Sequence, residues 1–231
     1  DLTGGGGLLA PVHGLAVAEA GGVPVLWDVN PGAVEAAASD VRRATGTACE
    51  AQCVDITSQQ QVEGALAALL ARLGRLDGLV NNAARNPQVG SAQPAWSRLE
   101  NYPLDAWEAD LAVGLTGAML CSRVLGEAMA ARGGGVIVNI SSDLGVIAPD
   151  QRLYRQPGLP EDQQPAKPVS YSVVKHGLIG LTRSLATELA ATGITVNAVC
   201  PGFTDTPLLD GAVETIMRKT GRTADEARAS L

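Results

Sequence analysis

A tyrosine and a lysine stand four positions apart in the stretch YSVVKHG, at Tyr171 and Lys175. A helix would place the two side chains on one face, one turn apart. A free phenol has a pKa of about 10 and is a poor base at neutral pH, but a nearby ammonium lowers that pKa because it favours the phenolate. The pair could therefore exchange a proton with an alcohol or ketone oxygen. The alternative is an ordinary pair on a helix surface.

A hydroxyl that could serve the same reaction belongs to Ser142, the second serine of VNISS. A serine hydroxyl can stabilise negative charge that develops on a substrate oxygen. Ser142 lies 29 positions before Tyr171, and a long segment separates the two. They can still meet, because the strand end and the helix start that carry them are fixed by the sheet and not by the length of the loop.

Four consecutive glycines lie near the start of the chain, in the stretch TGGGGLLA that includes Gly4 and Gly7. Glycines let the backbone approach a ligand closely, and the helix that follows offers free amides and a positive dipole end to a pyrophosphate. Asp28 ends the next apolar stretch, 21 residues after Gly7. A carboxylate there would accept hydrogen bonds from a ribose 2′-hydroxyl and repel a 2′-phosphate, which favours NAD over NADP. The alternatives are a flexible glycine run and a surface aspartate in a turn.

The segments around these residues alternate between short apolar runs and longer helical stretches. Nearly continuous β-branched and aliphatic runs predict strands that are covered on both faces. Strands that alternate with helices predict a parallel sheet with right-handed crossovers, so we expect an α/β fold in which residues 1–231 form one domain with a doubly wound, Rossmann-like sheet. The predicted strands are 23–29, 76–82, 135–141 and 194–200, and the predicted helices are 10–20, 31–45, 58–73, 104–131 and 170–191.

Residues 148–168 interrupt this alternation with five prolines and many polar side chains. Because proline removes a backbone donor, we expect neither a helix nor a central strand here. Long loops in compact domains are usually functional or disordered. This Pro-rich excursion is therefore either a lid over a substrate or a mobile surface loop.

The composition limits the classes of function. The 231 residues are 46% hydrophobic and 18% charged, as in a globular chain with one sizeable core. A net charge of −7 argues against a nucleic-acid partner, which would need a basic patch. No apolar run approaches about 18 residues and no secretion signal is visible, so we expect no membrane span and a cytoplasmic location. The four cysteines lack a second Cys or His pair, so we expect structural thiols and no metal site.

Six motifs follow one another along the chain, each at a predicted strand end or helix start. They are TGGGGLLA, VDI around Asp55, NNAA at 81–84, VNISS at 138–142, YSVVK at 171–175 and PGFTDT at 201–206. A YxxxK pattern alone is common by chance, but six motifs in this order are not. Together they resemble the motifs of the short-chain dehydrogenase/reductase family, and the resemblance covers nearly the whole chain.

The resemblance implies three catalytic residues. Tyr171 is similar to the family's proton donor and acceptor. Lys175 is similar to the residue that holds the nicotinamide ribose and lowers the pKa of the tyrosine, and Ser142 to the hydroxyl that polarises the substrate carbonyl.

The resemblance also implies a set of cofactor-binding positions. Asp55 and Ile56 match positions beside the adenine. Asn81 and Ala83 match the turn under the cofactor, and Thr206 matches a contact near the nicotinamide carboxamide. The full set is Gly4, Gly7, Leu8, Asp28, Asp55, Ile56, Asn81, Ala83, Tyr171, Lys175, Pro201, Gly202, Thr204 and Thr206.

Two features depart from the family pattern within its motifs. Gly114 stands where the family usually has an asparagine that supports a water relay from the lysine to solvent, which puts the proton route in question. Leu8 and Ala10 stand where the shorter members have glycines. Gly7 instead matches the spacing of longer, sugar-nucleotide-modifying members.

The two ends of the chain depart from the pattern as well. A strand of about five to eight apolar residues should precede the glycine turn, but only two residues precede Thr3. The chain also stops in a predicted helix, TADEARASL, with no final strand after it. We therefore expect a sheet that lacks its first and last strands, either in the protein or only in this stretch of it.

These patterns together predict an oxidoreductase that transfers a hydride between NAD and a secondary alcohol or ketone, with NADP as the less favoured cofactor. Two alternatives stay open: a cofactor-binding protein of the same fold with little catalysis, and an enzyme that modifies a sugar or nucleotide-linked sugar. Members of the family usually form homotetramers or homodimers through helices that match 104–131 and 170–191. Packing within one chain explains the small residues of the first of these helices equally well.

Overall fold

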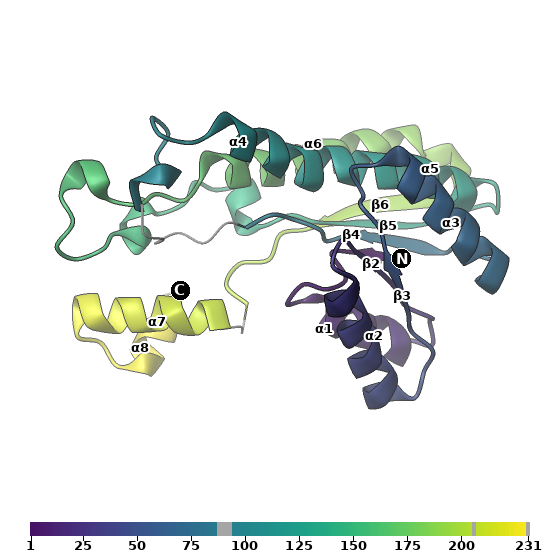
Figure 1. The fold of residues 1–231 in the computed structure, drawn as a ribbon, viewed down its shortest axis with the longest axis horizontal. Helices are drawn as coiled ribbons and strands as arrows, with labels where there is room; N and C mark the ends of the chain where they lie inside the picture. Colours follow the sequence, from purple (N-terminus) through teal and green to yellow (C-terminus); the bar gives the residue numbers. More distant parts are fainter. Residues whose placement is uncertain (87–93, 205–206, 230–231) are drawn as a thin grey trace.

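The computed structural model of the chain describes residues 1–86, 94–204 and 207–229 (Figure 1). The strands of this part form one six-stranded sheet in the order β3-β2-β1-β4-β5-β6, and every neighbouring pair is parallel. This confirms the predicted α/β fold with a doubly wound sheet. The strands are β1 (Leu2–Thr3), β2 (Val25–Asp28), β3 (Glu50–Cys53), β4 (Gly78–Asn81), β5 (Gly135–Ile140) and β6 (Ile194–Val199).

The place of the first strand is filled, although by only two residues. Leu2 pairs with Leu26 of β2 on one side and with Val80 of β4 on the other, so β1 lies in the centre of the sheet. The expectation of a sheet without its first strand is corrected by this short strand. In the described residues β6 is the last strand, and α7 (Pro207–Thr220) and α8 (Ala224–Ala229) follow it.

Strand β3 was not predicted from the sequence. Its four residues, EAQC, lack the continuous apolar run that marks the other strands, because β3 lies at the edge of the sheet and none of its residues is fully buried. It pairs only with β2.

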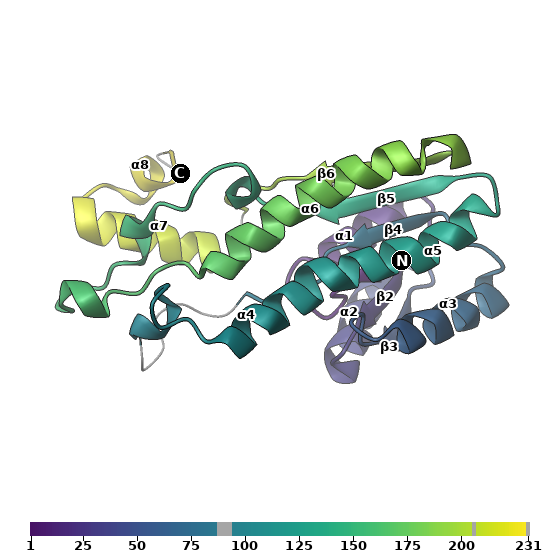
Figure 2. The ribbon, with the colours of Figure 1, turned by 90° about the horizontal axis from the view of Figure 1, so that it is seen from above.

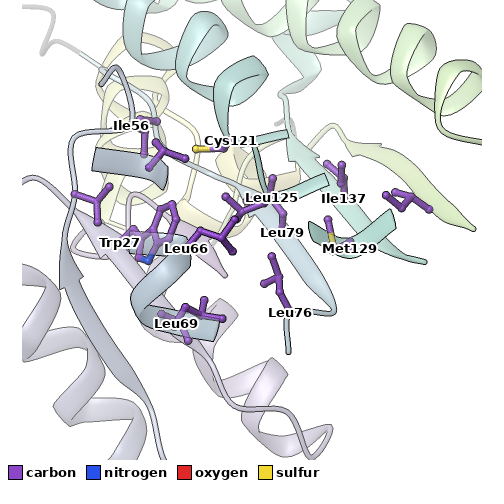
Figure 3. Packing of buried hydrophobic residues seen from close by; sticks show 14 of the residues in the cluster. Trp27, Ile56, Leu66, Leu69, Leu76, Leu79, Cys121, Leu125, Met129 and Ile137 are labelled. Carbon is purple, nitrogen blue, oxygen red and sulfur yellow. The ribbon is translucent and has the colours of Figure 1, made fainter. Parts of the chain in front are cut away.

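Helices cover both faces of the sheet (Figures 1 and 2). On one face, α3, α5 and α6 pack over a core of fully buried side chains, among them Trp27, Leu79, Leu125 and Ile137 (Figure 3). On the other face, α1 and α2 pack against Leu26. Trp27 and Leu26 point to opposite faces because successive side chains alternate along a strand. These helices are α1 (Ala10–Glu19), α2 (Pro31–Thr45), α3 (Gln59–Leu73), α5 (Ala118–Ala130) and α6 (Val169–Glu188).

Local capping residues fix the ends of two of these helices. The side chains of Asn30 and Ser58 accept hydrogen bonds from the first turns of α2 and α3. Gly46 and Gly74, both with φ near +70°, end the same helices in the left-handed conformation that glycine adopts at little cost. The sequence therefore sets the bounds of these two helices almost by itself.

The predicted helix 104–131 is interrupted. α4 (Leu104–Leu111) continues into a π-helical turn, η2 (Ala112–Gly117), before α5 begins. A side chain at Gly114 would place its Cβ 2.5 Å from Cγ1 of Val174 in α6, and one at Gly117 would meet Ile56 at 2.7 Å. These two glycines therefore serve packing within the chain, while assembly into dimers or tetramers stays a prediction.

The contact with Val174 also explains one departure from the family pattern. The Cβ of an asparagine at this position would lie 2.5 Å from Cγ1 of Val174, which fills the space beside Gly114. The absence of an asparagine amide at position 114 and the presence of Val174 are therefore consequences of the same packing arrangement.

Within the described residues, one helical stretch is long and apolar enough to cross a membrane by length and composition alone. It is 104–130, which combines α4, η2 and α5. Half of its most apolar 18-residue window is buried inside the structure. A long helix that packs on a core passes the same test, so this stretch is weak grounds for a membrane span.

The Pro-rich excursion contains more regular structure than expected. Two short 3-10 turns lie within it, η4 (Gln151–Tyr154) and η5 (Glu161–Gln163), so the expectation of no helical structure is wrong at these residues. The second turn begins after Pro160, where a fixed φ suits a helix start. The buried amide of Gln164 bonds to the backbone of Gln156 and Leu159 and holds the segment together.

Three more helices lie outside the main layers. A short 3-10 helix, η1 (Pro94–Ser97), contacts the excursion near η5. After β6, α7 (Pro207–Thr220) and α8 (Ala224–Ala229) lie beside the excursion and away from the sheet (Figures 1 and 2). Lys219 of α7 donates a hydrogen bond to the carbonyl of Arg152 at 2.6 Å.

Two glycine turns touch at the amino-terminal ends of β5 and β6. Gly134 has a φ of +146°, and a Cβ there would lie 2.6 Å from the carbonyl oxygen of Gly193. The two strands start directly after this contact, and Gly135 pairs with Ile194. Only glycine permits the two backbones to come so close.

A polar network is buried between the sheet and two helices. The amide of Asn81 donates to Oδ1 of Asn139 at 2.8 Å and to the hydroxyl of Ser122 at 3.0 Å. The amide of Asn139, which is fully buried, donates to the hydroxyl of Thr182 at 2.8 Å. The network thus joins β4 and β5 to α5 and α6, and both side-chain amides donate within it, while Oδ1 of Asn81 is buried without a partner.

The substitution Asn139→Leu should lower the free energy of unfolding by about 1–3 kcal/mol, because it leaves buried amide and hydroxyl groups without partners. Asn197 lies on the neighbouring strand β6 and is exposed, so Asn197→Leu is the matched control and should cost less. Urea unfolding followed by circular dichroism measures both. Equal losses in the two variants would contradict the structural role of the network.

The contact between Gly114 and Val174 predicts a packing conflict that a second substitution relieves. Gly114→Ala and Val174→Ala should each destabilise the chain, but the double variant should be more stable than the sum of the two losses predicts. The expected coupling is about 0.5–3 kcal/mol, as for residues in direct contact. A double-mutant cycle in urea measures it, and strictly additive losses would show that the two positions do not press on each other.

Candidate active site

Helix α6 and the carboxyl end of strand β5 bring the predicted catalytic residues together. Lys175 is almost fully buried, and its Nζ donates a hydrogen bond to the carbonyl of Ile140 at 2.7 Å. In return, the hydroxyl of Ser141 donates to the carbonyl of Lys175 at 2.7 Å. These two bonds dock the first turns of α6, including Tyr171, against the residues that follow β5.

Ser142 lies next to Tyr171 despite the long excursion between them. Burial has the largest effect on the pKa of Tyr171 and raises it, while the neighbouring Ser142 hydroxyl lowers it. The same hydroxyl donates to Oδ1 of Asp143 at 2.7 Å and accepts a bond from the amide of Leu144 at 3.2 Å. The structure therefore brings the predicted serine and tyrosine side by side, with Asp143 as a neighbour that the sequence did not reveal.

The pKa of Tyr171 is raised, which corrects one expectation from the sequence. Burial is the largest cause, and the charge of Asp143 adds to it. The Nζ of Lys175 lies 5.6 Å from the centre of the phenol ring and is bonded to the carbonyl of Ile140, and burial prevails over the lowering of the pKa that was predicted for this ammonium. Burial also lowers the pKa of Lys175 itself, to about 8.

The glycine turn lies against the backbone of β4 and the end of β2. Gly4 has a φ of +68°, and a Cβ there would lie 2.8 Å from Cα of Ala83, so only glycine fits. The carboxylate of Asp28 accepts bonds from the amide of Gly6 at 3.0 Å and from the amide of Asn30 at 2.9 Å. Asp28 therefore lies directly beside the turn, and its contact with a ribose stays a prediction.

The start of α1 leaves few amides for a pyrophosphate. Its N-cap residue, Leu9, provides no side-chain hydrogen bond, but the amide of Ala10 donates to the carbonyl of Gly7 at 3.2 Å and Pro11 has no N–H. Leu8 is exposed at this helix start. The fit to a dinucleotide therefore rests on the glycine turn and Asp28.

Two neighbouring asparagines have different positions from those expected. The side chain of Asn81 points into the buried polar network and away from the glycine turn. Asn82, which was not predicted, donates from its side chain to the carbonyl of Thr3 at 3.1 Å, and its backbone amide bonds to the Thr3 hydroxyl. Ala83 also donates its amide to that hydroxyl, so Asn82 and Ala83 carry the contact with the turn.

The residues predicted beside the adenine differ in their surroundings. Ile56 is buried in the core, where it packs against Gly117. The carboxylate of Asp55 accepts two bonds from Thr57, one from its amide and one from its hydroxyl. Ile56 therefore supports the site from within the core, and Asp55 lies in the turn after β3.

The loop after β6 closes the site on the side of Asp143. The carbonyl of Pro201 accepts a hydrogen bond from the backbone amide of Asp143 at 2.8 Å. Gly202 lies near the side-chain carboxylate of Asp143. Thr204 is exposed and bonds weakly to the carbonyl of Gly202. Thr206, predicted near the carboxamide, lies outside the described residues.

The excursion adds residues that the sequence did not point to. Burial is the largest cause of a raised pKa at Tyr154, and electrostatic interactions with Tyr171 and Asp143 add to it. Lys167 places its Nζ 3.9 Å from the centre of the Tyr171 ring. The spacing of Lys167 and Tyr171, four positions, was visible in the sequence, but Pro168 between them prevents a helical pairing.

No metal centre is visible in the part of the chain that the structure describes, since no group of three or more His, Cys, Asp or Glu side chains is suitably placed. Cys49 and Cys121 are buried, and burial raises their pKa values to about 11 and about 12. Cys53 and Cys200 are exposed. The two buried thiols are unreactive core residues.

Comparison with protein families identifies two matching regions. The model of the short chain dehydrogenase family matches residues 2–154, and a model described as enoyl-(acyl carrier protein) reductase matches residues 161–229. The boundary between the two matches falls in the Pro-rich excursion.

Named relatives agree with these matches. A cis-4-hydroxycyclohexanecarboxylate dehydrogenase of Sinomonas cyclohexanicum is 36% identical over 198 residues, which are 84% of this chain and 68% of the relative. A D-beta-hydroxybutyrate dehydrogenase of Cupriavidus necator is 29% identical over 77% of this chain and 59% of the relative. The chain thus spans between about half and two thirds of the length of such relatives.

A solved structure shows the same arrangement of elements. NAD⁺-bound xylitol dehydrogenase superposes with a TM-score of 0.77 and 28% identity, over 96% of this chain and 76% of that one. The fold, the family models and the relatives agree with the order of the six motifs. The chain therefore belongs to the short-chain dehydrogenase/reductase family.

Proposed function

We propose that this protein interconverts a secondary alcohol and a ketone, with a nicotinamide dinucleotide as hydride carrier. The observation that carries the proposal is the position of Tyr171. Its phenol lies beside the hydroxyl of Ser142 and the ammonium of Lys175, at the carboxyl ends of the strands that also hold the glycine turn. Ligands in open parallel sheets bind at these strand ends.

The side chains have separate tasks in this reaction. In oxidation, the substrate hydroxyl gives its proton to the phenolate oxygen of Tyr171 while its carbon loses a hydride, and a ketone results. In reduction, the phenol gives its proton to the carbonyl oxygen while the carbonyl carbon gains a hydride, which a bound reduced nicotinamide would supply. The hydroxyl of Ser142 stabilises the charge on that oxygen. When bound, the oxidised nicotinamide would accept the hydride, and its positive charge would favour the phenolate.

Lys175 offers hydrogen-bond donors to the phenol and to a ribose. An ammonium has three donors, and one of them is used by the carbonyl of Ile140. Two donors are left for a ribose and for the phenol. Because the pKa of Tyr171 is raised in the chain alone, the phenol is protonated at neutral pH and is ready to act as the acid of the reduction.

Asp28 supports NAD as the preferred cofactor. One of its oxygens accepts from the amide of Gly6 in the glycine turn and the other from the amide of Asn30, so the carboxylate is held beside the turn where a ribose would lie. A fixed negative charge there repels a 2′-phosphate, and a neutral 2′-hydroxyl can donate to it.

A second candidate function is cofactor binding with little catalysis. Gly114 favours it, since neither this glycine nor Val174 beside it can replace the amide of the family's water relay. A panel of alcohols and ketones tested with NAD⁺ and NADH distinguishes the two functions, because binding without hydride transfer would support this second one.

The substitution Tyr171→Phe should abolish turnover, with a loss of at least about 100-fold as expected for a general acid and base. It should leave NADH binding nearly unchanged, because it removes one oxygen and keeps the ring. Turnover is measured by NADH absorbance, and binding by the quenching of tryptophan fluorescence. A variant that keeps its turnover would remove the phenol from the mechanism.

The substitution Asp28→Asn should raise kcat/KM for NADP relative to NAD about ten-fold, which is about 1.4 kcal/mol, because it removes the repulsion of a 2′-phosphate. Asp40→Asn is the control, since Asp40 is an exposed residue of α2 that pairs with Arg43. Steady-state rates with both cofactors give the ratio. An unchanged ratio in the Asp28 variant would show that this carboxylate does not select the cofactor.

A further inference from the structure

Lys167 is a second lysine beside the candidate catalytic tyrosine, and it comes from the Pro-rich excursion. Its Nζ lies 3.9 Å from the centre of the Tyr171 ring and donates a hydrogen bond to Oδ1 of Asn86 at 2.8 Å. The side chain is partly buried, and burial lowers the pKa of its ammonium to about 8. Both of these contacts, the amide of Asn86 and the ring of Tyr171, are neutral, whereas the ammonium is a cation with three hydrogen-bond donors.

The charge of Lys167 lacks a direct counter-ion. In the described part of the chain, no carboxylate lies within ion-pair distance of its Nζ. Asp110 acts on it only through its charge. That carboxylate is buried and already accepts bonds from the hydroxyls of Tyr102 and Ser170 at 2.7 and 2.6 Å, with Arg85 at 3.6 Å.

Two further sources of positive charge lie near Lys167: the ammonium of Lys175 and the start of helix α6. Lys175 lies close enough that its pKa is lowered by the charge of Lys167. Helix α6 begins at Val169, two residues after Lys167, and no side chain caps its first turn. The positive end of a helix dipole disfavours a cation and favours an anion. A lysine ammonium in this position therefore creates a strong local preference for a negative group.

Asp143 brings negative charge to the other boundary of the site. It belongs to the segment after β5, and it raises the pKa of Tyr171. Its Oδ1 accepts bonds from the hydroxyl of Ser142 and the amide of Leu144, both at 2.7 Å, so these donors offset part of its charge. The positive charge of the site is consequently concentrated on the side of the excursion.

We propose that Lys167 binds a carboxylate of the substrate, so that the substrates are hydroxy acids and the corresponding oxo acids. This inference rests on the proposed function and names the substrate class of the same site. A carboxylate would pair with the ammonium while the substrate hydroxyl lies at the phenol of Tyr171. The names of two relatives, a hydroxycyclohexanecarboxylate dehydrogenase and a hydroxybutyrate dehydrogenase, describe acids of this kind as substrates of those proteins.

The first test compares an acid with its methyl ester, which has the same carbon skeleton and no charge. cis-4-Hydroxycyclohexanecarboxylate and its ester are oxidised with NAD⁺ by the full chain and by three variants: Lys167→Met, Lys167→Arg and Lys219→Met. In Lys167→Met, the ratio of kcat/KM for acid over ester should fall about 10- to 100-fold, the value of a hydrogen bond to a charged group. Lys167→Arg should keep most of the preference.

Lys219→Met is the matched control, because Lys219 is an exposed lysine whose Nζ bonds to the carbonyl of Arg152 and not to Tyr171 or Asn86. It removes one positive charge and should leave the acid-to-ester ratio unchanged. Equal losses on acid and ester in Lys167→Met would overturn the proposal, since they would show that Lys167 only holds the ring of Tyr171 in place.

A binding measurement separates this proposal from the proposed function. Cyclohexanecarboxylate has no hydroxyl to oxidise, so its binding, followed by calorimetry, needs no turnover. Binding that is at least about 10-fold weaker in Lys167→Met, with cyclohexanecarboxamide as the neutral control, supports the carboxylate site even if no alcohol is turned over. If alcohols are oxidised but the acid binds equally to both proteins, the substrate class is wrong and the proposed function stands.

Discussion

The pair of hydrogen bonds between helix α6 and the end of strand β5 holds the active site together. Lys175 donates to the carbonyl of Ile140, and Ser141 donates to the carbonyl of Lys175. A buried ammonium is costly unless it is hydrogen-bonded, so this cross-connection is both a requirement of the fold and the means of positioning the site. Since it fixes the first turns of α6 on the sheet, the excursion before α6 could grow without moving Tyr171 away from Ser142.

The sequence predicted those parts of the structure that depend on local pattern. Apolar runs gave the positions of four strands, and the predicted helix 31–45 coincides with α2, which the structure shows to be capped by Asn30 and Gly46. The edge strand β3 was missed because its exposed residues carry no apolar run. Asn81 and Asn82 were confused because neighbouring residues of a strand face opposite sides, and their register becomes known only from the sheet.

Electrostatic properties were the least predictable part of the site. The spacing of Tyr171 and Lys175 predicted an ammonium near a phenol, but the direction of the pKa shift depends on burial and on Asp143, neither of which follows from spacing. Lys167 reaches the ring from an excursion that has no periodic pattern. Residues that contact one another only through the tertiary fold can be assigned to one site only after the backbone is known.

The glycine contact between the turns before β5 and β6 has a consequence at the opposite end of the molecule. Both strands are six residues long, so their shared starting level at Gly135 and Ile194 is carried over a rigid span of about 20 Å to Ile140 and Val199. Bulkier side chains at Gly134 or Gly193 would push the two ladders out of step. The contact at the strand starts therefore sets the alignment of the two strand ends that lie beside the active site.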